Sequence, residues 1–189
     1  MQVFELKGEV RKDVGKKATK AVRREAMVPC VLYGGGDNVH FMVKDRDLKN
    51  LIYTPKVYLV KLNLTEGSRM CVMREIQFHP VTDKILHIDF YEINDEKPVV
   101  MEIPVKTTGH AVGVQAGGKL VVITRKLKVR ALPKDMPDEL TIDVTSLGVG
   151  KSIKVQDLTF TDFDIENAKS VVIAQVKLTR AARAAQSAS

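Results

Sequence analysis

The feature that most constrains the fold of this chain is a short polar break near its middle. Residues 94–98 read Asn-Asp-Glu-Lys-Pro and separate two long stretches that are both rich in Val, Ile and Leu. A polar segment with a proline is typical of a connection between domains, and 189 residues suffice for two domains of about 90 residues each. The sequence therefore predicts one domain over residues 1–94, a second over residues 95–178 and a flexible tail over residues 179–189.

The first half predicts strands together with two short helices. The order of apolar and polar residues along the chain indicates strands over residues 3–11, 31–33, 57–64, 69–78 and 84–92. A first helix is expected over residues 18–27, and its residues at core-facing helical spacing are Ala18, Ala21, Val22 and Ala26. A second helix is expected to start at Asp45 as its N-cap and to bury Leu48, Leu51 and Ile52. This half is thus a β-sheet or small barrel with two short helices.

The second half predicts almost nothing but strands. Segments rich in Val and Ile are separated by Gly, Pro, Asp and Ser, and they cover residues 99–106, 120–123, 126–132, 140–143, 152–155 and 171–177. The whole chain is therefore expected to be mainly β, with a β-rich C-terminal domain after the first one.

Apolar segments and cysteines indicate the cellular compartment in which the protein works. No apolar run approaches the ~20 residues that span a bilayer, and the N-terminus lacks the apolar core of a signal peptide. Cys30 and Cys71 lie in apolar surroundings, so we expect buried reduced thiols in preference to a disulfide or a metal site. We therefore expect a cytoplasmic protein with no membrane partner.

The basic charge of the chain is concentrated near its N-terminus. Residues 7–24 contain eight basic and two acidic residues, a net charge of +6 within a chain of net charge +7. The basic residues are Lys7, Arg11, Lys12, Lys16, Lys17, Lys20, Arg23 and Arg24. A solvated helix face explains such a run about as well as a binding site does, as far as charge alone goes. However, the run covers a strand end, a glycine-containing loop and a helix start, where backbone N–H groups favour phosphate.

A second candidate feature is the strand Ile85–Tyr91. Its alternation directs Leu86, Ile88 and Phe90 inward and His87, Asp89 and Tyr91 outward. Phosphates repel a carboxylate, so Asp89 is useful on a face that binds nucleic acid only if it accepts hydrogen bonds from bases. Gln77 and His79 could extend this polar patch, whereas without the basic run a solvent-exposed His and Asp would be the default interpretation.

Other chemistries fit the sequence poorly. His79, His87 and Asp89 lack the closely spaced ligand pairs of a structural zinc site. Residues 113–119 match the glycines and lysine of a P-loop, but Leu120 stands where Ser or Thr must hold Mg²⁺, so we interpret the segment as a β-turn. No nucleophile lies in an activating motif. We therefore expect no enzyme, no cofactor, no metal and no small-molecule substrate.

Across both halves, the sequence resembles the family of large-subunit ribosomal protein twenty-five, in its long form known as general stress protein CTC. The resemblance covers nearly the whole chain. In the first domain the matching segments are residues 9–12, 15–16, 29, 31–35, 77, 79–80 and 87–90. In the second domain they are residues 113–118, 132–133 and 140–144.

This resemblance implies an N-terminal β-barrel that binds the loop E region of 5S rRNA within the large subunit, with neighbouring ribosomal proteins as further candidate partners. The residues that it assigns to base edges or sugars are Arg11, Tyr33, Gln77, His87 and Asp89. Those that it assigns to phosphates are Lys16, Thr19, Lys20 and Arg23. The chain departs from the family at Ala21, where the family often has arginine, and Lys17 or Arg24 would compensate.

Two other functions remain as alternatives. One is a stress-induced protein that acts away from the ribosome through protein–protein contacts made by the second domain. The weaker one is an NTPase. Co-sedimentation with the large subunit separates the first alternative from a ribosomal role, and an ATP-binding measurement tests the second.

Overall fold

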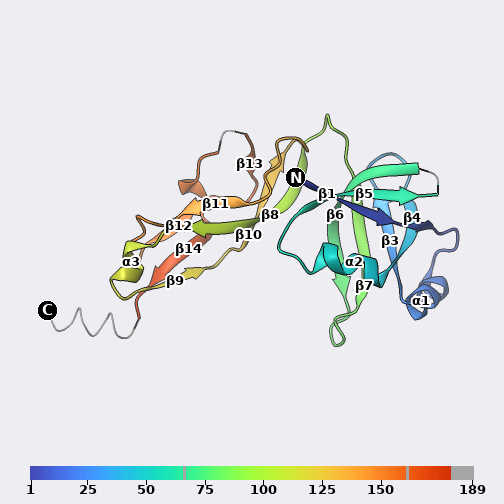
Figure 1. Cartoon of the computed structure of the whole chain (residues 1–189), viewed down its shortest axis with the longest axis horizontal. Helices are drawn as coiled ribbons and strands as arrows, with labels where there is room; N and C mark the ends of the chain where they lie inside the picture. The colour runs from blue at the N-terminus through green and yellow to red at the C-terminus, as the bar shows by residue number, and fades with distance from the viewer. Residues whose placement is uncertain (66, 161, 180–189) are drawn as a thin grey trace. The chain divides into compact units, whose positions relative to one another are not determined.

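The computed structural model describes residues 1–65, 67–160 and 162–179 and is built mainly from strands (Figure 1). The chain forms two compact units. The first comprises Met1–Val99 with Leu132–Lys134, and the second comprises Val100–Ala131 and the chain from Asp135 onward. The predicted flexible tail lies outside the described residues, apart from Thr179.

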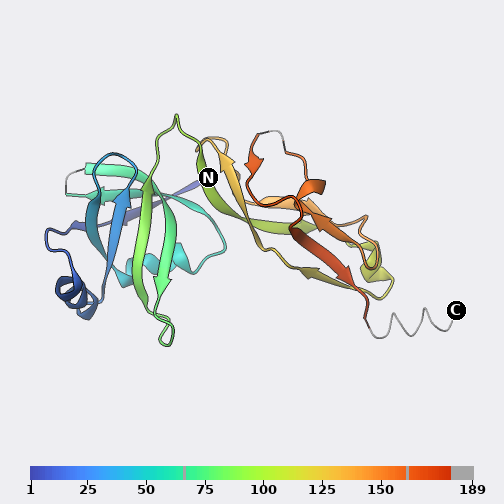
Figure 2. The same ribbon diagram turned by 180° about the vertical axis from the view of Figure 1, so that it is seen from behind.

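The first unit contains one sheet and two helices. Its strands are β1 (Gln2–Lys7), β2 (Glu9–Val10), β3 (Met27–Tyr33), β4 (Val39–Lys44), β5 (Tyr58–Leu64), β6 (Gly67–Phe78) and β7 (Ile85–Glu92). Its helices are α1 (Lys16–Arg24) and α2 (Asp45–Ile52). The strand order is β1-β5-β6-β7-β3-β4-β2. Seen from both sides, α1 and the β6–β7 hairpin lie at the same end of this unit (Figures 1 and 2).

The sheet curls into a half-barrel because one continuous segment supplies both of its edges. β1 pairs with β5 at one edge and β2 pairs with β4 at the other, and only Gly8 separates β1 from β2. A Cβ atom at Gly8 would lie 2.8 Å from Cδ2 of the buried Phe41 ring, so a larger residue where the edges meet would force that ring to shift. The mainly β fold with an N-terminal curled sheet is therefore confirmed.

Alternating side chains fill the inside of this sheet. Phe41 and Phe90 are fully buried, and their rings lie 5.6 Å apart between centroids. Leu6, Leu32 and Ile88 are also buried in the same cluster. The inward positions expected for the strand around His87 are confirmed at Ile88 and Phe90, while Leu86 is only half-buried. The opposite face of these strands is left for polar side chains.

The helices differ from the expected ones at their ends. α1 starts two residues earlier than expected and stops at Arg24, and Ala26 then takes a left-handed backbone with φ of 56°. The prediction that Ala21 and Ala26 face the core is wrong, since both are exposed and only Ala18 and Val22 are half-buried. α2 does start at Asp45, but its N-cap is Lys44 and no side chain caps it.

The second unit consists of two small sheets. The strands of the first, in the order β11-β8-β10-β13, are β11 (Leu140–Asp143), β8 (Val99–Thr108), β10 (Lys126–Ala131) and β13 (Asp164–Ile165). Those of the second, in the order β12-β14-β9, are β12 (Ser152–Lys154), β14 (Val172–Lys177) and β9 (Lys119–Val122). The other elements are the helical turns α3 (Val112–Gln115) and η1 (Val155–Asp157). β10 falls within the strand expected over residues 126–132, and it buries Leu127, Val129 and Ala131 in strict alternation with basic residues.

The segment that resembles a P-loop is a packing element. Residues 112–115 form the single turn α3 instead of the expected β-turn. The N–H of Gly113 donates to Leu147 O at 2.9 Å, and the N–H of Gly118 donates to Gly113 O at 2.8 Å. Because these amides are already bonded within the protein, they are not free to cradle a phosphate.

Candidate nucleic-acid interface

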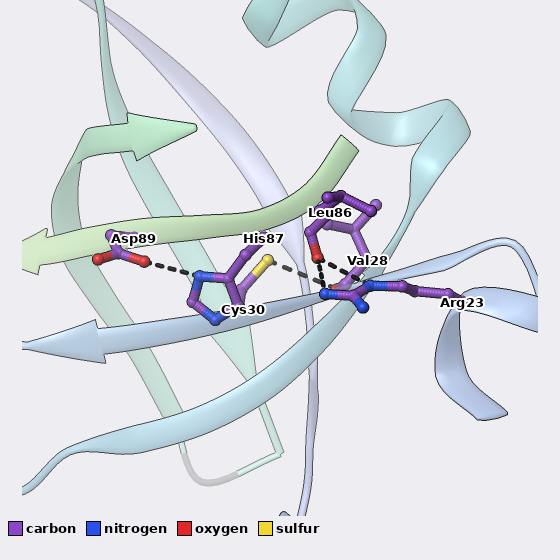
Figure 3. A network of polar contacts seen from close by, with 6 residues as sticks. All are labelled: Arg23, Val28, Cys30, Leu86, His87 and Asp89. Atoms are coloured by element: carbon purple, nitrogen blue, oxygen red, sulfur yellow. Dashed lines mark hydrogen bonds and ion pairs between the residues drawn. The ribbon is translucent and has the colours of Figure 1, made fainter. Parts of the chain in front are cut away.

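The outward face of β7 carries a coupled His–Asp pair. Nδ1 of His87 lies 2.7 Å from Oδ1 of Asp89, and each side chain is 27% exposed (Figure 3). Because His87 and Asp89 are two residues apart on a strand, their side chains project from the same face. The contact fixes the carboxylate in one orientation and leaves Nε2 of His87 as the imidazole atom that is not used in this pair.

Pairing between strands extends this face into a continuous row. Asp89 is in register with Glu75 of β6 on one side and with Val31 of β3 on the other. Val31 is in register with His40 of β4, whose carbonyl accepts from the N–H of Arg11. Directly paired residues share a face, so this row runs from Arg11, which directly follows β2, across the four strands β4, β3, β7 and β6 to Glu75. Gln77 lies beside it, in register with His87.

An aromatic pair lies at one end of the same face. The rings of Tyr33 and Tyr91 meet edge to face at 5.7 Å between centroids. The guanidinium of Arg74 lies 5.9 Å from the centroid of the Tyr91 ring. Flat rings beside a cation are suited to stacking or sugar contacts with a nucleotide.

The basic residues of α1 form the second part of the site, which we call the basic helix. The exposed members are Lys16, Lys17, Lys20, Arg23 and Arg24. Thr19 is half-buried, and Nη2 of Arg11 lies 3.5 Å from its Oγ1 while donating to Asp13 O at 3.1 Å. Arg11 thereby joins the row on the sheet to the helix.

Arg23 has a different environment from its neighbours in the basic helix. Its Nε and Nη2 donate to the carbonyl oxygen of Leu86 at 3.1 and 2.8 Å (Figure 3). Leu86 directly precedes His87, so this contact places the end of α1 beside the coupled His–Asp pair.

The structure brings most of the predicted site residues together. The exception is His79, whose side chain is bonded within a turn. His79 lies in the turn after β6, and its Nδ1 accepts from the N–H groups of Val81 and Thr82 at 3.3 Å each. Its imidazole therefore orders the hairpin turn. Sequence reasoning missed His40, Arg74 and Glu75. The apolar residues at positions 39, 41 and 43 would have indicated the strand that carries His40.

The cysteines take no part in this site. Both are free and buried, as predicted. Burial raises the pKa of Cys71 to about 12 and raises the pKa of Cys30 far above its ordinary value, so neither thiol ionises near neutral pH. Within the described parts of the chain, no cluster of His, Cys, Asp and Glu is arranged to hold a metal ion, and no helix has the length and apolarity to cross a membrane.

Each of the two units matches a family of known proteins. Residues 6–90 match the Ribosomal L25p family, and residues 98–180 match the family described as ribosomal protein TL5, C-terminal domain. A protein of Porphyromonas gingivalis named large ribosomal subunit protein bL25 is 54% identical over 187 residues, which cover 98% of this chain and 97% of that protein. Its namesake in Phocaeicola vulgatus is 51% identical over 192 residues, covering 98% of this chain and 97% of the relative.

A third relative with the same name, from Bacteroides thetaiotaomicron, is 47% identical over 193 residues and covers 100% of this chain and 98% of its own. The similarity thus extends through both units at a level that fixes the family. The chain belongs to the Ribosomal L25p family, in the long form that carries a TL5-type C-terminal domain.

Proposed function

We propose that this chain is a structural protein of the large ribosomal subunit that binds 5S rRNA and has no enzymatic role. The observation that carries the proposal is the row from Arg11 to Glu75 lying on the same unit as the basic helix. Polar side chains in and beside this row, such as Arg11, Asp89 and Gln77, suit base edges, whereas a cationic helix suits phosphates, and an RNA-binding surface needs both. Relatives named large ribosomal subunit protein support the assignment.

The two parts of this surface have separate tasks in the proposal. On the sheet, Tyr33, Gln77, His87 and Asp89 contact base edges or sugars in the widened minor groove of the loop E region. Arg11 contributes at the junction with the basic helix. On the helix, Lys16, Lys17, Lys20 and Arg24 contact phosphates, and Thr19 supports them. The exposed lysines offer point charges that release counterions on binding.

Two measurements test the proposal. The protein should co-sediment with large subunits in moderate salt, and it should bind isolated 5S rRNA more tightly than an unrelated hairpin of the same length. If the protein stays in the supernatant and does not prefer 5S rRNA, the ribosomal role is contradicted, and a function through protein–protein contacts away from the ribosome is favoured.

A further inference from the structure

Strand β3 has a gap in its backbone hydrogen bonding at Pro29. β3 lies between β4 and β7 in the sheet, and Pro29 is buried. Proline has no N–H, so a central strand that contains it loses one ladder hydrogen bond. A carbonyl on a neighbouring strand is then left without its usual donor.

The strand registers show on which side the gap lies. His40 O accepts from Arg11 N, so the polar backbone groups of His40 are directed toward β2 and those of Phe41 toward β3. Cys30 pairs with Phe41. Backbone groups alternate in direction along a strand, so those of Pro29, one residue earlier, are directed toward β7.

The carbonyl that lacks a donor on β7 is that of Leu86. β3 and β7 are parallel, with Cys30 opposite Ile88. Continuing this register by one residue places Pro29 opposite His87. In a parallel ladder the N–H of a residue bonds to the carbonyl of the residue before its partner. An N–H at position 29 would therefore donate to Leu86 O.

We propose that Arg23 is a positioning residue that fills this gap and holds the basic helix against β7. Its two guanidinium N–H groups donate to the Leu86 carbonyl (Figure 3). This contact fixes the end of α1 one residue away from the His87–Asp89 pair, so the phosphate-binding and base-reading groups reach the RNA in a fixed arrangement. The inference rests on the proposed RNA-binding function and assigns Arg23 a task other than phosphate binding.

The chemistry of the contact favours arginine at this position. α1 buries no residue fully, so apolar packing alone holds it weakly to the sheet. A guanidinium can direct two N–H groups at one acceptor from a fixed plane, whereas a lysine ammonium is a flexible point donor. Arg23→Lys should therefore keep the charge and lose most of the positioning.

The test compares Arg23→Ala, Arg23→Lys and Lys20→Ala in the full-length chain. Binding to 5S rRNA is titrated at several salt concentrations. Both Arg23 variants should weaken binding about fivefold to tenfold while the salt slope stays unchanged. Lys20→Ala should instead reduce the magnitude of the slope by about 0.7 to 0.9. In the free protein, amide hydrogen exchange over residues 16–24 should speed up in the Arg23 variants and stay unchanged in Lys20→Ala.

A slope reduced by Arg23→Ala as much as by Lys20→Ala would overturn the proposal, and so would unchanged amide exchange. Pro29→Ala gives a further check, because it restores an N–H that can reach Leu86 O. The exchange difference caused by Arg23→Ala should shrink in that background, and an equal effect in both backgrounds contradicts the role in the ladder gap. Absence of 5S rRNA binding by the unmodified chain would sink the proposed function alone, because the exchange measurements need no RNA.

Discussion

The carboxylate of Asp89 sits where a phosphate-binding surface would avoid negative charge. Glu75, directly opposite on β6, adds a second carboxylate to the same face. Two such groups repel the RNA backbone, so Asp89 is useful on this face only where it accepts hydrogen bonds from base amino groups. Because His87 already holds Oδ1 of Asp89, the acceptor is oriented before RNA arrives, and little ordering entropy is lost on binding.

Asp89→Asn tests this role at a single atom. The change keeps the shape but replaces one acceptor with a donor, so binding to 5S rRNA should weaken by roughly 1 to 3 kcal/mol, by analogy with base readout in duplex DNA. The loss should persist in high salt, because the contact is not an ion pair with phosphate. Titration of 5S rRNA and an unrelated hairpin at two salt concentrations measures it.

The control for this change is Glu75→Gln, which removes the same charge at the paired position on β6 and leaves His87 untouched. It should slightly strengthen binding to both RNAs, since one repulsive charge is lost. If Asp89→Asn also tightens both RNAs to the same extent, Asp89 is a surface charge and reads no base.

Lys20 provides the corresponding test for phosphate contacts. It is exposed on the basic helix, so Lys20→Ala should weaken binding to any 5S-like RNA and lower the magnitude of the salt slope by about 0.7 to 0.9. Lys56→Ala, at an exposed loop position after α2, is the matched control and should leave the slope unchanged. Equal slopes for the two variants and the unmodified chain would mean that Lys20 belongs to a solvated surface.

Among the elements, the ones that the sequence predicted well are strands with strict alternation. β7 and β11 were expected within one residue of their observed ends, because Leu, Ile or Phe recurs at every second position in both strands. β4 was missed, since Met42 interrupts the alternation of its apolar and polar residues, and two-residue β13 is too short to leave a pattern. The first helix was misplaced because its ends depend on Gly15 and on the left-handed Ala26, not on apolar periodicity.

The turn α3 supplies a prediction about stability. A Cβ atom at Gly113 would lie 2.6 Å from the backbone N of Val149 and 2.7 Å from the carbonyl carbon of Gly148. Backbone atoms cannot move aside as a flexible side chain can, so Gly113→Ala should destabilise the second unit by about 1 to 3 kcal/mol. Thermal or urea unfolding of the full chain measures the change.

Gly148→Ala is the control for this prediction. Its added Cβ would meet only Cγ of Lys151, at 3.8 Å, so its stability should change far less. Binding to 5S rRNA by the folded Gly113→Ala protein should be unaffected, because this glycine lies in the second unit. A stability equal to that of Gly148→Ala would show that the close contact is relieved without strain.

At the scale of the whole molecule, the sequence indicated candidate binding residues but not how they lie relative to one another. His87 and Asp89 follow from alternation along one strand, and the basic helix follows from local charge. The row from Arg11 to Glu75 depends on registers between four strands, which no local pattern specifies. The Arg23–Leu86 contact joins residues 63 positions apart, and only the fold reveals the ladder gap that it fills.

The two halves of the chain should fold independently of one another. The seven-stranded sheet and its buried cluster are built from residues before position 94, and β1 and β2 close the sheet without help from later residues. A fragment of residues 1–94 should therefore unfold cooperatively on its own and keep most of the affinity for 5S rRNA, while a fragment of residues 95–189 should not prefer this RNA. Circular dichroism melting and filter-binding titrations of both fragments beside the full chain check this. If the 95–189 fragment carried the 5S rRNA affinity instead, the row on β7 and the basic helix would not be the binding surface.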